Sequence, residues 1–210
     1  MTQGSESSSI IHPTLHHIGL ETRNPEKMID WYAKVVGMVT ICSTSNAWGS
    51  KAVMFMSASF LSNDRANNRV AIFSTPELKE DTDKHTHAKL QHVAFEYATI
   101  DDLLSTYTRL KGLSIEPVLA TDHGPTIAFY YEDPDGNSVE LFVDNFGDWD
   151  KSQEYVRASP EFHKNPMGAF VDAGKLVAAR QAGMSFAELH RRAYAGEFPP
   201  SRSMDPRILM

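Results

Sequence analysis

The pattern of apolar and polar positions occurs twice along the chain. In each copy an alternating segment, which predicts a strand, leads into apolar residues every three or four positions, which predict a helix. The first copy runs from His17 to Met38 and the second from His92 to Leu113, and they align without a gap at a spacing of 75 residues. The chain is therefore a tandem repeat in which each copy opens with a histidine.

The first module, residues 14–82, is predicted to fold in the order strand, helix and three strands. Its opening strand is expected over 15–20, where alternation places His17 and His16 on opposite faces. The helix follows, with Asn24 as N-cap, Pro25 at the first helical position and an end at Gly37. The helix is expected over 25–36 and the later strands over 38–43, 52–57 and 69–73.

The second module, residues 89–146, repeats that order. The segment from Glu132 to Asn137 combines proline, glycine, asparagine and aspartate between two apolar runs, which predicts a hairpin turn. A helix is expected over 100–111, and strands over 91–97, 115–120, 126–131 and 138–143.

Beyond Phe146 the composition changes, and the periodicity predicts helices over 173–181 and 185–193. Ser185 and Glu188 form a capping-box pattern at the start of the second helix. The expected fold class is thus α+β: two tandem βαβββ modules over 14–146, a helical C-terminal extension over 147–210 and a disordered lead-in over 1–13. We expect the extension to pack on the modules, and covering a site or joining a second subunit are alternatives.

Composition narrows the function classes. The net charge is −7 with no run of lysine or arginine, so nucleic acid is not an expected partner. No segment approaches the roughly 18 apolar residues of a membrane span, and the N-terminus lacks a secretory signal pattern. The only cysteine, Cys42, has no partner within the chain, which favours a reducing environment. We therefore expect a cytoplasmic protein, assembled as a homo-oligomer such as a dimer.

His17, His92 and Glu140 are the candidate metal ligands. Two histidines at matching places in two related modules can meet where the modules meet, and imidazole with carboxylate suits Fe(II), Mn(II) or Zn(II). Glu140 lies in the apolar strand SVELFV, where burying a carboxylate is costly unless it is paired or bound to a metal. Each residue taken alone also fits a plainer role, the histidines as hydrogen-bonded strand residues and Glu140 as a side chain facing water.

The segments LHHIGL, LQHVAF and DPDGNSVELF resemble the vicinal oxygen chelate superfamily, also called the glyoxalase/bleomycin-resistance/extradiol dioxygenase superfamily. The resemblance covers roughly 14–146 and implies a curved mixed sheet around a metal cavity. It places ligands at His17, His92 and Glu140. The position of a fourth ligand, which glyoxalases use, falls on Ala71, and alanine cannot bind a metal. The resemblance thus implies two histidines and one carboxylate, an arrangement that leaves positions open for substrate and O₂.

Within that superfamily the sequence is most similar to the type I extradiol ring-cleaving dioxygenases, which implies three further site residues. Tyr130 matches a tyrosine that those enzymes have ten residues before the glutamate, and His123 matches a histidine on the loop ahead of the penultimate strand. Asn68 stands where those enzymes have a histidine, and an asparagine cannot shuttle a proton near neutral pH. His123 is then the expected proton donor, with His85 or His87 as alternatives; otherwise the reaction differs from ordinary catechol cleavage.

The expected function is therefore an extradiol-type dioxygenase that cleaves a small aromatic vicinal diol with O₂ at a non-haem Fe(II) site, with Mn(II) as the alternative ion. Two other classes stay open. A lyase, isomerase or epimerase of the superfamily would use similar chelation without O₂, and a binding protein of the bleomycin-resistance kind would need no metal. The identity of the substrate lies beyond what the sequence indicates.

Overall fold

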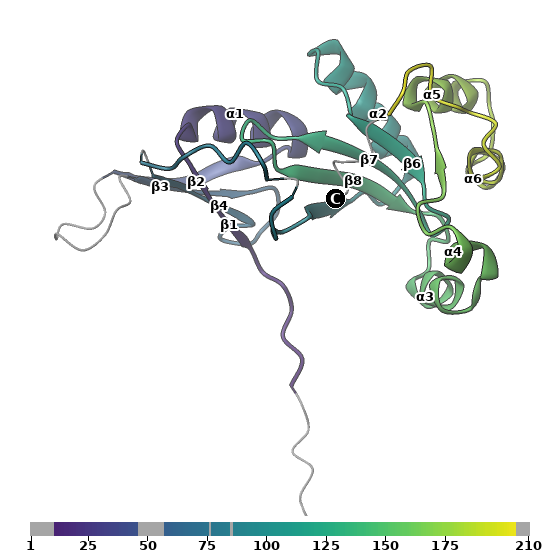
Figure 1. Cartoon of the computed structure of the whole chain (residues 1–210), viewed down its shortest axis with the longest axis horizontal. Helices are drawn as coiled ribbons and strands as arrows, with labels where there is room; N and C mark the ends of the chain where they lie inside the picture. The colour runs from purple at the N-terminus through teal and green to yellow at the C-terminus, as the bar shows by residue number, and fades with distance from the viewer. Residues whose placement is uncertain (1–10, 46–56, 76, 85, 205–210) are drawn as a thin grey trace, which may run out of the picture.

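The computed structural model describes residues 11–45, 57–75, 77–84 and 86–204. Strands and helices follow the predicted βαβββ order twice, and helices follow in the C-terminal part (Figure 1). The fold class is thereby confirmed as α+β. Most of the predicted lead-in, His85 and nearly all of the strand predicted over 52–57 lie outside the described residues. None of the helices that the structure describes is long and apolar enough to cross a membrane.

The first module forms a four-stranded sheet with one helix. Strand β1 pairs with β4 in parallel, and β3 pairs with β4 and β2 in antiparallel fashion, which gives the order β1-β4-β3-β2. Helix α1 ends where Gly37 adopts a left-handed conformation with φ 70° and donates its N–H to the Tyr32 carbonyl. The elements are β1 Ile18–Thr22, α1 Pro25–Val36, β2 Val39–Ser45, β3 Ser57–Ser62 and β4 Val70–Ser74.

The second module forms its own sheet, to which the extension adds a strand. The order is β5-β8-β7-β6-β9, where β9 is the two-residue strand Ala169–Phe170. The module's elements are β5 His92–Glu96, α2 Ile100–Gly112, β6 Leu119–Asp122, β7 Thr126–Glu132 and β8 Ser138–Asp144. Pairing β9 with the edge strand β6 closes an edge that would otherwise face solvent.

The extension consists of helices around the outer end of the second sheet. Figure 1 shows α1, α2 and α5 on one side of the sheets, and α3 and α4 on the other. Both predicted helices are present as α5 and α6, and Ser185 caps α6 by accepting the N–H of Glu188. The helices are α3 Trp149–Ala158, α4 Pro160–Lys164, α5 Ala173–Gln181 and α6 Phe186–Tyr194. Helices α3 and α4 and the strand β9 were not predicted.

Several strand boundaries differ from the prediction. Strand β3 ends at Ser62, although the strand was expected to end at residue 57, and the starts of two other strands depend on backbone pairing. The first strand begins at Ile18 rather than Leu15, because Ile18 is the first of these residues to enter the ladder with β4. Strand β6 begins at Leu119 rather than Ile115, because the Ile115 N–H is bonded to the last turn of α2. Pro117, which follows shortly, has no N–H to donate to a ladder.

The two faces of the second sheet differ in what covers them. One face packs against α2 and joins the main apolar core through residues such as Phe129, Val139 and Leu141. The opposite face carries a smaller apolar cluster of Leu119, Ala128 and Tyr130. Because side chains alternate along a strand, Glu140 shares this second face with Tyr130, its direct partner in the ladder between β7 and β8. The candidate site residues of the second module therefore lie on the face turned away from α2.

Candidate metal centre

His92 and Glu140 lie side by side. The Nε2 of His92 is 3.1 Å from Oε2 of Glu140, and the Glu140 side chain is 9% exposed. The Nδ1 of His92 is hydrogen-bonded to Oε1 of Gln91, an oxygen that can only accept. With Oε1 facing the ring, Nδ1 carries the hydrogen, and without a second hydrogen the Nε2 lone pair is directed at the carboxylate. A lone pair and an anionic oxygen do not attract each other, so this pair needs a proton or a cation between them.

These atoms fit a metal ion. Ligand atoms about 2.1 Å from a metal and at right angles to each other are about 3 Å apart, as these two are. A hydrogen bond from the other ring nitrogen is what metal-bound histidines usually make, since it fixes the tautomer. Only one oxygen of Glu140 faces His92, because the other accepts a hydrogen bond from Tyr130 at 2.9 Å.

A hydrogen-bonded chain continues from Glu140 away from His92. The Tyr130 hydroxyl donates to Glu140 and lies 3.0 Å from Nε2 of His123, and Nδ1 of His123 lies 3.2 Å from the Pro166 carbonyl. The Tyr130 proton is used by Glu140 and the Pro166 oxygen can only accept, so satisfying all three bonds requires hydrogens on both nitrogens of His123. The chain is thus complete when His123 is an imidazolium.

Burial shapes the acidity of both groups in this chain. Burial lowers the pKa of His123, and the nearby Glu140 carboxylate opposes that shift. Burial also raises the pKa of Tyr130, and Glu140 adds to the rise, so the tyrosine keeps its proton. Burial therefore disfavours the imidazolium that completes the chain, and it makes that imidazolium, when it forms, a stronger acid than a free one.

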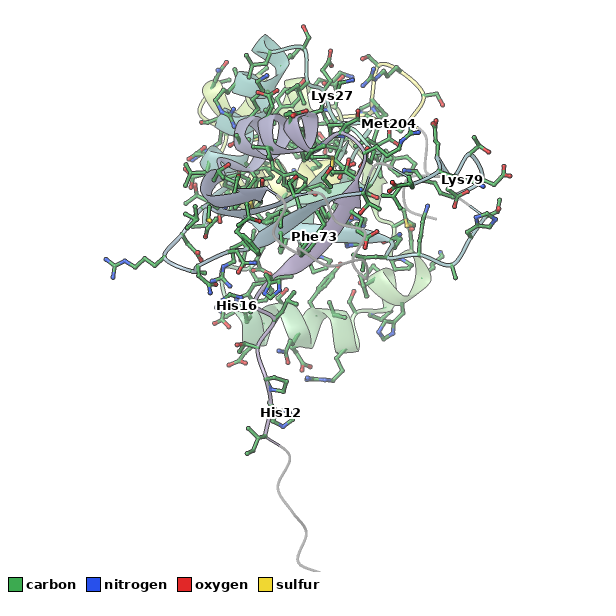
Figure 2. The ribbon with its side chains drawn as sticks, turned by 90° about the vertical axis from the view of Figure 1, so that its left-hand side faces the viewer. His12, His16, Lys27, Phe73, Lys79 and Met204 are labelled. Atoms are coloured by element: carbon green, nitrogen blue, oxygen red, sulfur yellow. The ribbon has the colours of Figure 1, made fainter. Side chains whose placement is uncertain are left out.

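The remaining predicted site residues lie outside this cluster. His17 is exposed, precedes β1 and contacts the ring of His16, with their Nδ1 atoms 3.0 Å apart. Figure 2 places His16 on the extended N-terminal segment, at the border of the sheet that carries Phe73. Among the described residues no three His, Cys, Asp or Glu side chains are gathered so as to hold a metal, so the structure does not bring His17 to His92 and Glu140.

Strand register nevertheless gives His17 and His92 equivalent places. His92 pairs with Ser138 and Ala94 with Glu140, while Ile18 pairs with Val70 and Gly19 with Ala71. His92 thus lies two residues before Ala94, the partner of Glu140. His17 lies two residues before Gly19, the partner of Ala71, which is the equivalent position in the first module. A cavity of about 290 Å³ lies between the edge strands, lined by Gly19 and Leu20 of β1 and by His92 and Val93 of β5.

Asn68 and His87 do not reach the hydrogen-bonded chain. Asn68 is buried in the loop ahead of β4, and among the described residues no hydrogen bond joins it to His123, Tyr130 or Glu140. His87 is exposed and pairs with Asp81 at 2.8 Å. Of the candidate proton donors described, only His123 is in contact with the rest of the site.

Sequence reasoning missed the contributions of Gln91 and Pro166. Gln91 directly precedes His92, so its place beside a candidate ligand could have suggested a supporting hydrogen bond. Pro166 acts through its backbone carbonyl from a segment 43 residues beyond His123, and no side-chain pattern signals such a contact.

Comparisons with known proteins agree with this architecture. The family model described as the Glyoxalase/Bleomycin resistance protein/Dioxygenase superfamily matches residues 14–141. Among solved structures, the glyoxylase/bleomycin resistance protein/dioxygenase domain from Frankia sp. EAN1pec has a similar fold, with a TM-score of 0.53, 14% identity and coverage of 66% of this chain and 96% of that one.

Two curated relatives from Rhodococcus globerulus are more similar in sequence. Biphenyl-2,3-diol 1,2-dioxygenase 2 is 32% identical over 188 residues, which cover 90% of this chain and 92% of the relative. Biphenyl-2,3-diol 1,2-dioxygenase 3 is 33% identical over 187 residues, which cover 88% and 91%. With the family model spanning both modules and these relatives spanning nearly the whole chain, the chain belongs to the glyoxalase/bleomycin resistance protein/dioxygenase superfamily.

Proposed function

We propose that this protein is an extradiol-type dioxygenase that cleaves a small aromatic vicinal diol with O₂. The observation that carries the proposal is the hydrogen-bonded chain from His123 through Tyr130 to Glu140, next to His92. It joins candidate ligands to a proton donor on one face of one sheet. The two similar Rhodococcus proteins, named for their action on biphenyl-2,3-diol, support the reaction class and an aromatic substrate.

In this proposal His17, His92 and Glu140 hold Fe(II), with Mn(II) as the alternative. His92 and Glu140 provide a matched nitrogen and oxygen, and His17 is proposed as the third ligand because its place in the repeat matches that of His92. When bound, the ion would hold both diol oxygens and O₂ together, which three protein ligands leave room for. Gln91 orients His92, and Tyr130 orients Glu140 by its hydrogen bond.

The residues around the chain suit an aromatic diol. Phe142 and Phe170 are half-buried beside the buried cluster of Leu119, Ala128 and Tyr130, and they offer an apolar surface for a ring. His123 supplies a proton to oxygen as the ring opens, and Tyr130 keeps its hydroxyl hydrogen near the diol. Asn68 takes no part in proton transfer, because its amide does not titrate near neutral pH.

The test is oxygen consumption by protein purified without oxygen and loaded with a single metal. We expect Fe(II)-loaded protein to take up one O₂ for each catechol consumed and to form a coloured ring-fission product. The His123→Gln variant should keep its metal and lose turnover by about 100-fold or more. Turnover of a diol without O₂ uptake, or activity with Zn(II) or Mg(II) but not Fe(II), would instead support a lyase or isomerase.

A further inference from the structure

The loop that carries His123 is held from the side opposite Tyr130. It spans only three residues, His123 to Pro125, between the end of β6 at Asp122 and the start of β7. Asp122 is completely buried, and Oδ1 of its carboxylate accepts the N–H of Gly124 at 2.9 Å. The carboxylate therefore stabilises the turn that sets the direction of the neighbouring His123 side chain.

The C-terminal extension supplies the partner of that carboxylate. Nδ1 of His190, in α6, lies 2.8 Å from Oδ2 of Asp122. Asn145, which follows β8, donates to Oδ1 of Asp122 and to the Gly124 carbonyl. A completely buried carboxylate requires such partners, because an uncompensated charge in the interior is strongly destabilising.

Two further parts of the extension, the backbone at Gly168 and the side chain of Tyr155, lie against the same loop. Gly168 has φ 67°, and a Cβ built on it would overlap the backbone carbonyl of Asp122, so this backbone passes directly against the loop. A Cβ built on Gly124 would lie 2.7 Å from the Tyr155 hydroxyl of α3. The Pro166 carbonyl, two residues before Gly168, is the acceptor for Nδ1 of His123. Side chains or backbone from α3, the segment before β9 and α6 thus meet at one short turn.

We propose that His190 is a positioning residue for His123, acting through the buried carboxylate of Asp122. His190 does not touch the hydrogen-bonded chain itself; it holds the turn so that the His123 ring lies between the Pro166 carbonyl and the Tyr130 hydroxyl. This inference rests on the proposed function in assigning a catalytic role to His123. It makes the C-terminal extension part of the active site rather than packing alone.

The experiment compares His190→Leu with a matched control, Arg180→Leu. Arg180 also joins the extension to the modules, through Asp101 of α2 at 2.7 Å, but contacts no residue of the loop or of the chain that begins at His123. With Fe(II)-loaded protein and a catechol, we expect His190→Leu to lower kcat by about 10- to 100-fold while KM changes less than about twofold. Arg180→Leu should change neither constant. His190→Gln should recover part of kcat, because its amide can still donate to Asp122.

A second readout needs no metal and no turnover. The ring signals of His123 in NMR spectra of the metal-free protein, assigned with a His123→Gln variant, should shift in His190→Leu and stay in place in Arg180→Leu. If the wild-type protein does not act on catechols, the proposed function fails. The NMR comparison alone then tests whether His190 positions His123. If His190→Leu does not fold, Asp122→Asn replaces it, since the amide keeps an acceptor for Gly124 but loses the charge that attracts His190. Unshifted His123 signals, or equal losses of kcat in the His190 and Arg180 variants, would overturn the inference.

Discussion

Tyr130 and Tyr131 are neighbours on β7 whose hydroxyl groups have opposite surroundings. Tyr130 is 3% exposed and its hydroxyl bonds to Glu140 at 2.9 Å and His123 at 3.0 Å. Tyr131 is 1% exposed and points to the other face, where its hydroxyl has no hydrogen-bond partner among the described residues. Replacing each with phenylalanine removes one oxygen atom from a buried site and separates the effect of the hydrogen bonds from that of the ring.

We expect Tyr130→Phe to destabilise the metal-free protein by about 2 kcal/mol, because it leaves a buried carboxylate oxygen and an imidazole nitrogen without their partner. For a chain of this length that corresponds to a melting temperature lower by about 4–8 °C. Tyr131→Phe removes a hydroxyl that is buried without a partner, so its melting temperature should stay the same or rise.

The measurement is thermal unfolding followed by circular dichroism, with all three proteins metal-free and in the same buffer. A similar loss in both variants would show that the hydroxyl bonds are not the cause. An unchanged melting temperature in Tyr130→Phe would show that the chain from His123 to Glu140 contributes nothing to stability, and the reasoning would be refuted.

Two further predictions concern the metal and pH. Alanine at any of the three proposed ligands should strip the metal from a folded protein in metal analysis, whereas His16→Ala should retain a full equivalent; a reversed result would place the wrong histidine in the site. In an NMR titration the Asp64 carboxyl should have a pKa of about 2, since Arg69 hydrogen-bonds to it, and should return toward its ordinary value of 3.8 in Arg69→Ala. Because folding lowers the pKa of Asp64, the stabilisation by this pair is complete above about pH 4 and is lost as the pH falls through about 2. An Asp64 pKa at its ordinary value in the folded protein would contradict this prediction.

Much of the fold could be predicted because the same pattern of apolar and polar residues occurs in both modules. The apolar stripe of α1, with Met28 and Tyr32 buried, and the alternation that puts Glu140 opposite Leu141 depend on local periodicity, and both are observed. Boundaries that depend on a distant partner could not be predicted. Whether Leu15 belongs to a strand depends on where β4 begins, and β9 exists because a two-residue segment lies against β6.

Sequence patterns predicted individual residues of the candidate site but not the contacts that the C-terminal extension makes with it. Strand alternation and repeat spacing indicated His92 and Glu140, and the family resemblance indicated Tyr130; the structure describes contacts of all three. The pairing of Asp122 with His190 joins positions 68 apart in sequence, and neither residue stands in a recognisable motif. Such contacts follow from how the extension folds back over the second module, which local patterns do not encode.

Strand β9 has a consequence for how this protein could be shortened or evolve. The family model ends at residue 141, yet the outer strand of the second sheet is β9, beyond that limit. Thr121 of β6 donates its hydroxyl to backbone carbonyls of Met167 and Ala169, so this edge is bonded to the extension through side chains as well as through the ladder. A chain cut near the end of the family match would leave β6 as a bare edge beside apolar Leu119, a surface prone to pairing with another molecule. The unit that the family model matches thus ends before the strand that covers the edge of β6 in this chain.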